Sequence, residues 1–218
     1  MFKIERSFPE PSALEKERMK KHGIPGCDEV KDRLLEDSFE KCYICETKDR
    51  FMDVEHRLPH RNGKYPERVF DWNNLFLCCK YCNTIKNKGI YDDGIIDCCV
   101  TDPETVIDME LIEDELRIMP LVDDNSVRLT VQLLYDVHGT RRTRMLKHGS
   151  EWLRKRIRET MNILFQKLSD YYDNTADEDA YNTVLAMIDR SAEYSGFTRG
   201  YIRRNSQLYS EFANKCVV

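Results

Sequence analysis

The stretch that decides the fold is bounded by two cysteine pairs, Cys42-Tyr-Ile-Cys45 and Cys79-Lys-Tyr-Cys82, with 33 residues between them. A two-residue gap lets both thiolates of a turn face one ion, and two such turns supply the four sulfur ligands of a tetrahedral structural zinc site. Such a site is closed, so it ties together a module too small to bury much core by itself. The sequence therefore predicts a structural Zn²⁺ bound by Cys42, Cys45, Cys79 and Cys82.

Five further cysteines lie outside this set. Cys78 could replace Cys79 as the third ligand, although only Cys79 keeps the two-residue gap to Cys82. Two other interpretations stay open, a thioredoxin-like redox pair and four unrelated buried thiols, but a redox pair needs only one such motif. We expect the remaining thiols to be core or surface residues, namely Cys27, Cys78, Cys98, Cys99 and Cys216.

Composition indicates a soluble globular protein. The chain has 218 residues, of which 41% are hydrophobic and 33% charged, and this suits one domain or slightly more. No stretch approaches the roughly 18 to 20 consecutive apolar residues of a membrane span, and residues 1–10 lack the apolar run of a signal peptide. We therefore expect a cytoplasmic protein with no membrane partner, whose clustered cysteines hold metal or stay reduced.

Charge is distributed unevenly along the chain, although the net charge is only -5. Residues 40–90 contain ten basic and seven acidic side chains, residues 91–126 one basic and twelve acidic, and residues 127–170 ten basic and four acidic. Solvated helix faces are the common explanation of such blocks. The alternative is that the basic stretches contact a polyanion and the acidic stretch docks a basic partner.

The spacing of apolar residues predicts an α+β fold that is mostly α. We expect a helical lead-in over 1–40, a compact metal-bearing module over 41–95 with Trp72 and Phe76 in its core, and a hairpin and helical region for partner docking over 96–218. The expected elements are a helix over 12–23, a helix capped by Asp28, a strand over 51–56, a hairpin of strands 106–111 and 116–121, and amphipathic helices from 127 onward.

Residues suited to hydrolytic chemistry occupy the interval between the cysteine pairs. It contains Asp53-Val-Glu-His-Arg-Leu-Pro59 and Asp71-Trp-Asn-Asn-Leu75, and Asn83 follows directly after the last cysteine. Hydrolysis of a phosphodiester needs a deprotonated water, a cation that stabilises charge on the scissile phosphate, and basic groups that hold the backbone. A histidine, a carboxylate and an amide oxygen on adjoining elements provide the first two.

In this region the chain resembles the HNH endonucleases, which have the ββα-metal fold. The resemblance requires at least eight residue types in one order over about 47 positions: a C-x-x-C pair, an acidic residue followed by His and then Pro, an Asn-Leu, and a second C-x-x-C followed by Asn and lysines. It implies a metal-dependent endonuclease in which a small zinc-stapled module lies between helical segments. The metal-binding helix would begin near Cys79 and Lys80.

The resemblance also implies roles for individual residues. His56 would be the general base, Glu55 and Asn83 would bind one divalent cation, Mg²⁺ or Mn²⁺, and Asn74 would tie the loop together and orient His56. Glu55 departs from the commoner Asp. On an ideal strand Glu55 and His56 point to opposite faces, so both can serve one site only where the strand is distorted or ends. Asp53 is an alternative ligand through water, or merely solubilises the strand.

Several basic residues flank these candidates. Lys86 and Lys88 could contact substrate phosphates, and Arg57 and Arg61 could reach the same surface. A solvated helix end is the alternative for the lysines. His60 is a competing base, although a lone loop histidine is usually a surface residue.

The wider context resembles one branch of these nucleases, the PtuB family of Septu anti-phage defence systems. It comprises Glu55-His-Arg-Leu-Pro, Tyr65-Pro-Glu, Asp71-Trp-Asn-Asn-Leu, Cys79-x-x-Cys-Asn and Asp102-Pro-Glu. For that family the implied partner is a PtuA-like ATPase of the ABC/SMC type. In a retron setting, a reverse transcriptase and its RNA-linked DNA would be further partners.

Two function classes follow from the sequence. The favoured one is an endonuclease effector that cuts DNA, with RNA such as tRNA as the alternative substrate, because the motif grips a backbone and needs few base contacts. The other is a zinc-stapled nucleic-acid-binding or adaptor module without catalysis. Such a module has no need of Glu55 and His56 beside the amide of Asn83.

Overall fold

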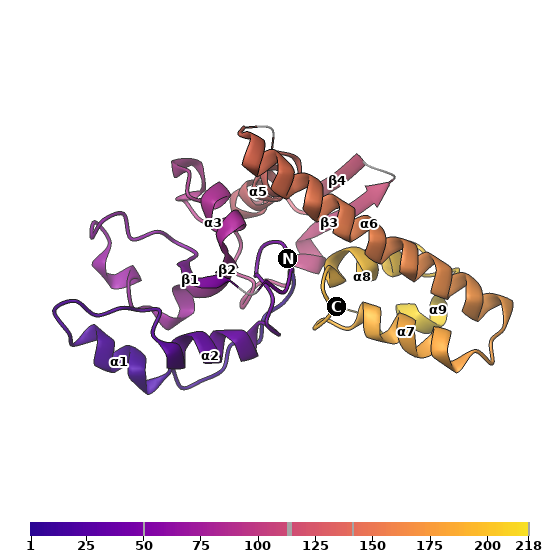
Figure 1. Cartoon of the computed structure of the whole chain (residues 1–218), viewed down its shortest axis with the longest axis horizontal. Helices are drawn as coiled ribbons and strands as arrows, with labels where there is room; N and C mark the ends of the chain where they lie inside the picture. The colour runs from indigo at the N-terminus through magenta and orange to yellow at the C-terminus, as the bar shows by residue number, and fades with distance from the viewer. Residues whose placement is uncertain (50, 113–114, 141, 218) are drawn as a thin grey trace.

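The computed structural model describes residues 1–49, 51–112, 115–140 and 142–217. The molecule is elongated, with α1, α2, β1 and β2 at one end, α7, α8 and α9 at the other, and the long α6 reaching between them (Figure 1). The helices are α1 (Ser12–Arg18), α2 (Asp28–Asp37), α3 (Lys80–Lys86), α4 (Pro103–Val106), α5 (Asn125–Gly139), α6 (Arg144–Asp173), α7 (Glu178–Ile188), α8 (Ser195–Arg204) and α9 (Ser210–Ala213).

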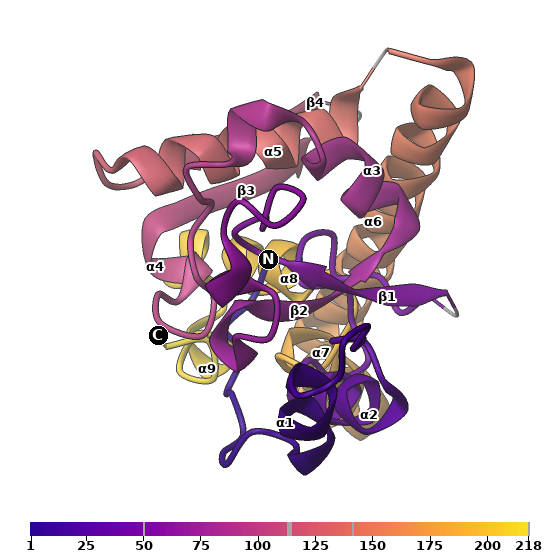
Figure 2. The ribbon, with the colours of Figure 1, turned by 90° about the vertical axis from the view of Figure 1, so that its left-hand side faces the viewer.

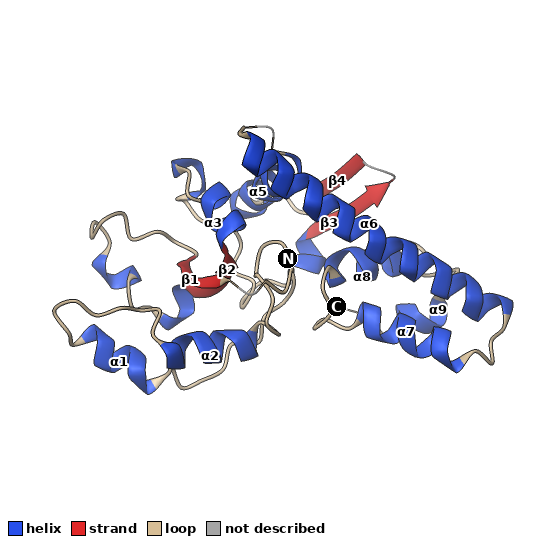
Figure 3. Ribbon diagram, viewed as in Figure 1, coloured by secondary structure: helices blue, strands red, loops and turns tan. Residues whose placement is uncertain are grey.

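Four strands form two separate antiparallel pairs among the described residues (Figure 3). β1 (Met52–His56) pairs with β2 (Leu75–Cys79), with His56 opposite Leu75. β3 (Ile107–Ile112) pairs with β4 (Glu115–Pro120), so the predicted hairpin is confirmed. Its expected turn includes residues 113–114, which lie outside the described residues.

The chain between β1 and β2 is an excursion that carries two 3-10 helices, Pro66–Arg68 and Trp72–Asn74. β2 continues without a break into α3, which packs against both strands (Figure 2). The local order is therefore strand, long loop, strand, helix. The predicted strand over 51–56 and the predicted helix start near Cys79 and Lys80 are both confirmed.

The N-terminal helices differ slightly from expectation. Ser12, whose side chain makes it a candidate N-cap, is instead the first helical residue, and α1 ends at Arg18, before the predicted end at Gly23. The chain turns back there, because the Ile24 backbone N–H donates to a Glu17 carboxylate oxygen at 3.0 Å. A Cβ at Gly23 would lie 1.8 Å from the Glu17 carbonyl oxygen, so the close crossing requires glycine at that position. Asp28 opens α2 and does not cap it.

Two hydrophobic cores hold the elements together. The smaller one packs α1 and α2 against the sheet around the indole of Trp72, with Leu14, Leu34 and Leu77. The larger core runs from Met1 to Cys216 and includes side chains from β2, β3 and the long helices. Trp72 and Phe76 are both buried, as predicted. The larger core extends across residue 95, and the domain boundaries drawn from the sequence stay a prediction.

None of the helices in the described part of the chain combines the length and the apolar character that a membrane span requires.

Candidate functional site

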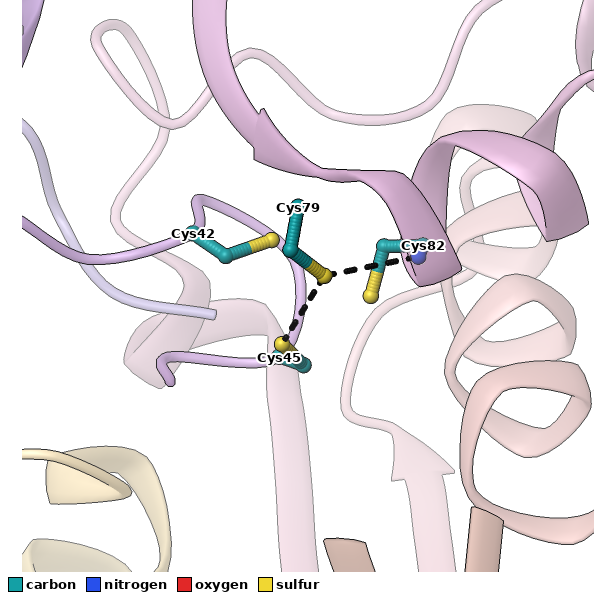
Figure 4. Close-up of side chains that lie close together, drawn as sticks. All are labelled: Cys42, Cys45, Cys79 and Cys82. Carbon is teal, nitrogen blue, oxygen red and sulfur yellow. Dashed lines mark hydrogen bonds between the residues drawn. The ribbon is translucent and has the colours of Figure 1, made fainter. Parts of the chain in front are cut away.

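The four predicted zinc ligands come together in one cluster. Their sulfur atoms all lie within 4.8 Å of one another, and all four side chains are buried. The two turns approach from different segments, one before β1 and the other at the junction of β2 and α3, and the sulfurs point toward a common centre (Figure 4). Four buried thiols at this spacing fit a tetrahedral structural site, so Cys42, Cys45, Cys79 and Cys82 could hold Zn²⁺.

The structure also resolves the choice between Cys78 and Cys79. The two residues are neighbours on β2, whose successive side chains point to opposite faces. Cys79 joins the cluster, where its sulfur lies 3.8 Å from that of Cys45. Cys78 lies 3.9 Å from the sulfur of Cys42 but outside the group of four. The assignment made from the two-residue gap is therefore confirmed.

The cysteine cluster fixes the start of α3. Cys79 is the N-cap, and its sulfur accepts from the Cys82 backbone N–H at 3.5 Å. Asn83 follows in the next position and Lys86 one turn later, both on the side of α3 that meets β1. The cysteine cluster at the helix start thus sets the position of two polar side chains beside His56.

A polar hollow of about 230 Å³ lies between the end of β1 and α3. Glu55, His56 and Asn83 all line this hollow. His56 is the last residue of β1, so the strand ends at the point where Glu55 and His56 both face the hollow. This resolves the difficulty that neighbouring strand residues face opposite ways. Other lining residues are Pro59, His60, Arg61, Asn62, Lys86, Asn87, Tyr91 and Asp92.

The imidazole of His56 is held by a backbone carbonyl. Its Nε2 lies 3.0 Å from the Val69 carbonyl oxygen, which can only accept, so Nε2 carries the proton and Nδ1 keeps its lone pair in the neutral ring. Burial lowers the pKa of His56 below its ordinary value and outweighs the raising effects of the Val69 carbonyl and of Glu55. The ring is therefore neutral near pH 7 and able to accept a proton.

Asn74 connects the two backbone segments that surround His56. Its Oδ1 accepts from the Leu58 backbone N–H at 2.7 Å, and its Nδ2 donates to the carbonyl oxygens of Leu58 at 2.9 Å and Arg68 at 3.1 Å. The side chain is buried. Arg68 precedes Val69, whose carbonyl contacts His56, so one amide fixes both the chain that leaves β1 and the segment that holds the imidazole.

Glu55 has a partner that the sequence did not reveal. Lys86 Nζ donates to Glu55 Oε1 at 2.6 Å and to the His56 carbonyl oxygen at 2.9 Å. The Lys86 side chain is only 3% exposed and that of Glu55 15%. Lys86 therefore points at Glu55 and not at solvent, and the predicted contact between Lys86 and substrate phosphate has no support in this geometry.

The other three predicted backbone-contacting cations are also paired with carboxylates. Arg57 lies 3.5 Å from Asp97 and donates to the Ile95 carbonyl, and Lys88 pairs with Asp136 on α5. Neither lines the hollow. Arg61 does line it and makes a two-pronged ion pair with Asp92.

Sequence reasoning missed the wall formed by Tyr91 and Asp92. Tyr91 is the last residue of a 3-10 turn at Gly89–Tyr91 and Asp92 follows it, so this turn returns the chain to the hollow. No spacing signal in the sequence indicates this return. The ring of His60, the competing base, lies 5.0 Å from that of His56, and its buried Nδ1 has no hydrogen-bond partner among the residues that the structure describes.

The hollow suits a hard cation in its donor types. Carboxylate and amide oxygens are the ligands that Mg²⁺ and Mn²⁺ take in proteins, and Glu55 and Asn83 supply one of each. Lys86 already binds one oxygen of Glu55. A separate hollow of about 700 Å³ lies between β4, α5 and α6, away from this site, and none of the predicted site residues lines it.

Comparison with known proteins gives one informative relative. No family model matches the chain. A Septu protein PtuB of Bacillus thuringiensis is 39% identical in an alignment of 87 residues that covers 37% of this chain. The chain spans about a third (32%) of the length of that relative. The chain is therefore similar, over this part, to a Septu PtuB protein.

Proposed function

We propose that the chain is a metal-dependent endonuclease of the HNH type. The observation that carries the proposal is the meeting of His56, Glu55 and Asn83 at one hollow, with His56 Nε2 held by the Val69 carbonyl so that Nδ1 is left to accept a proton. The order of β1, β2 and α3 supports it, since this is the arrangement that the ββα-metal resemblance implies.

The chain's own residues would divide the work of hydrolysis. His56 would take the proton of the attacking water at Nδ1, and Asn74 would keep the imidazole in place through the two segments that it bridges. A Mg²⁺ or Mn²⁺ ion, when bound by Glu55 and Asn83, would stabilise charge on the scissile phosphate and the leaving oxygen. Zn²⁺ in the cysteine cluster would hold α3, and therefore Asn83, against β1.

The similarity to a Septu protein PtuB supports a biological setting for this activity. We infer that the chain acts in anti-phage defence, as the nuclease partner of a PtuA-like ATPase. DNA is the favoured substrate. RNA, including tRNA, is the second candidate, particularly if the system is associated with a retron.

The decisive experiment compares His56→Ala with a control, His22→Ala, which removes an exposed histidine on the N-terminal segment. Both variants and the wild type are assayed for plasmid nicking and RNA cleavage with Mg²⁺ or Mn²⁺, alone and with the ATPase. His56→Ala should lose activity by roughly a hundredfold or more, with unchanged zinc content. Equal activity of His56→Ala and wild type would refute the proposed base.

A third variant, His60→Ala, separates the two histidines of the hollow. If His56 is the base, His60→Ala should retain most of the activity. Loss of activity in His60→Ala together with retention in His56→Ala would transfer the role. A protein that binds nucleic acid but never cleaves it, under all these conditions, would favour the non-catalytic zinc module.

A further inference from the structure

A second hollow adjoins the candidate catalytic hollow and shares a wall with it. Its volume is about 440 Å³, and its lining includes the three cationic side chains Arg61, Lys64 and Arg68. Pro59, Arg61 and Asp92 line both hollows. The ion pair between Arg61 and Asp92 therefore stands at the boundary between them.

The contact between Arg61 and Asp92 has the form of a phosphate contact. Arg61 Nε and Nη2 each donate to a different oxygen of the Asp92 carboxylate. This two-pronged geometry is also the one in which a guanidinium grips two oxygens of a phosphate. The two side chains are 35% and 31% exposed, so solvent and a ligand can reach them and the pair itself contributes little to folding.

The remaining cations of this hollow are arranged around one aromatic ring. The Arg68 guanidinium carbon lies 3.9 Å from the ring centroid of Tyr65, and Lys64 Nζ lies 5.0 Å from it. Arg68 also donates to the Pro59 carbonyl at 3.2 Å, which fixes its position. Lys64 is exposed and has no ion pair within the described parts of the chain.

We propose that this second hollow binds the phosphodiester backbone next to the scissile phosphate. In the free protein the Asp92 carboxylate accepts both hydrogen bonds of the Arg61 guanidinium, and a substrate phosphate replaces it on binding. This inference rests on the proposed nuclease function, because that function places the scissile phosphate in the neighbouring hollow beside His56. The exchange is balanced in charge, because a carboxylate and a phosphodiester each carry one negative charge. Lys64 and Arg68 then hold the strand as it leaves the catalytic hollow.

The test measures binding without cleavage, by fluorescence anisotropy of a short labelled DNA duplex in buffer without added Mg²⁺ or Mn²⁺ and without a chelator, over a range of salt concentrations. Lys64→Glu should weaken binding and lower the slope of log affinity against log salt by about one. The matched control is Lys16→Glu, an exposed lysine on α1. Asp92→Asn should strengthen binding by roughly two- to fivefold.

Asp93→Asn is the control for Asp92, because Asp93 lines the same hollow but makes no hydrogen bond or ion pair with Arg61, another described residue. An equal gain in both asparagine variants would overturn the proposed occupation of Arg61. If the Lys64→Glu protein binds the duplex as tightly as the Lys16→Glu protein does, the hollow is not a backbone-binding site. The same conclusion follows if the wild-type protein does not bind the duplex. An RNA duplex of the same sequence, measured in parallel, distinguishes the two kinds of backbone.

The same variants separate this inference from the proposed function. Binding that depends on Lys64 and Asp92 without His56-dependent cleavage would leave the backbone site standing and remove the nuclease. Cleavage that depends on His56, with normal binding by Lys64→Glu and Asp92→Asn, would do the reverse.

Discussion

At the scale of single residues, the most informative side chain is Asn74, because three hydrogen bonds from one buried amide hold the surroundings of His56. We expect Asn74→Ala to lower the free energy of unfolding by on the order of 1–3 kcal/mol, since it leaves partly buried backbone groups of Leu58 and Arg68 without their partner. Chemical denaturation measures this. Asn73→Ala, which removes an exposed neighbour, is the control and should change little. Equal effects would show that Asn74 has no special structural role.

The ion pair of Lys86 and Glu55 leads to a second prediction at this scale. In Lys86→Met the carboxylate of Glu55 loses its cation in a mostly buried position, so we expect a loss of stability of about 1–3 kcal/mol without added divalent cation. Mn²⁺ should restore part of that loss, because a divalent cation can replace the ammonium beside Glu55. Thermal unfolding with and without Mn²⁺ measures this.

The control for this prediction is Lys80→Met, which changes an exposed lysine at the start of the same helix. Its melting temperature should respond to Mn²⁺ as the wild type does. A Lys86→Met protein that gains no more from Mn²⁺ than Lys80→Met would contradict a cation site at Glu55.

At the scale of elements, α3 depends on the cysteine cluster for its first turn. Cys82→Ser should abolish stoichiometric zinc and unfold the local structure, because a structural ion contributes folding energy directly. Cys78→Ser is the sharpest control, since Cys78 is the neighbour of Cys79 on β2 yet lies outside the group of four. It should retain zinc. Metal analysis of freshly reduced protein decides, and zinc loss in Cys78→Ser would reopen the choice of third ligand.

The elements also show what sequence can and cannot predict. The residues of the four-cysteine cluster, the strand that ends at His56, the start of α3 and the hairpin were predictable, because each follows from spacing within a few residues. The pairing of Lys86 with Glu55 was not, since it joins residues 31 positions apart through the packing of α3 on β1. The return of Tyr91 and Asp92 to the hollow depends in the same way on tertiary structure.

At the scale of the whole molecule, the acidic stretch over 91–126 serves mainly to bind arginines of the same chain. Its carboxylates pair with Arg57, Arg61 and Arg128, and with several arginines close to the C-terminus. Docking of a basic partner on this stretch stays a prediction, but few of the acidic side chains that the structure describes there lack an ion pair. The acidic residues with ion pairs are Asp92, Asp97, Asp102, Glu104, Asp108, Glu110, Glu115 and Asp123.

Glu104 is the point at which this internal pairing joins distant parts of the chain. It lies on α4, is only 2% exposed, and receives two hydrogen bonds from Arg199 Nε on α8, at 2.8 and 3.0 Å, and another from Arg203. Because Glu104→Gln leaves a buried guanidinium without its counter-charge, we expect it to lower the free energy of unfolding by about 3–5 kcal/mol. Asp123→Asn breaks an exposed pair with Arg128 and should cost at most about 1 kcal/mol. Urea denaturation of both variants tests whether the burial of an ion pair decides how much it contributes to the free energy of unfolding. Similar losses in the two variants would show that the pairing of α4 with α8 does not hold the two regions together.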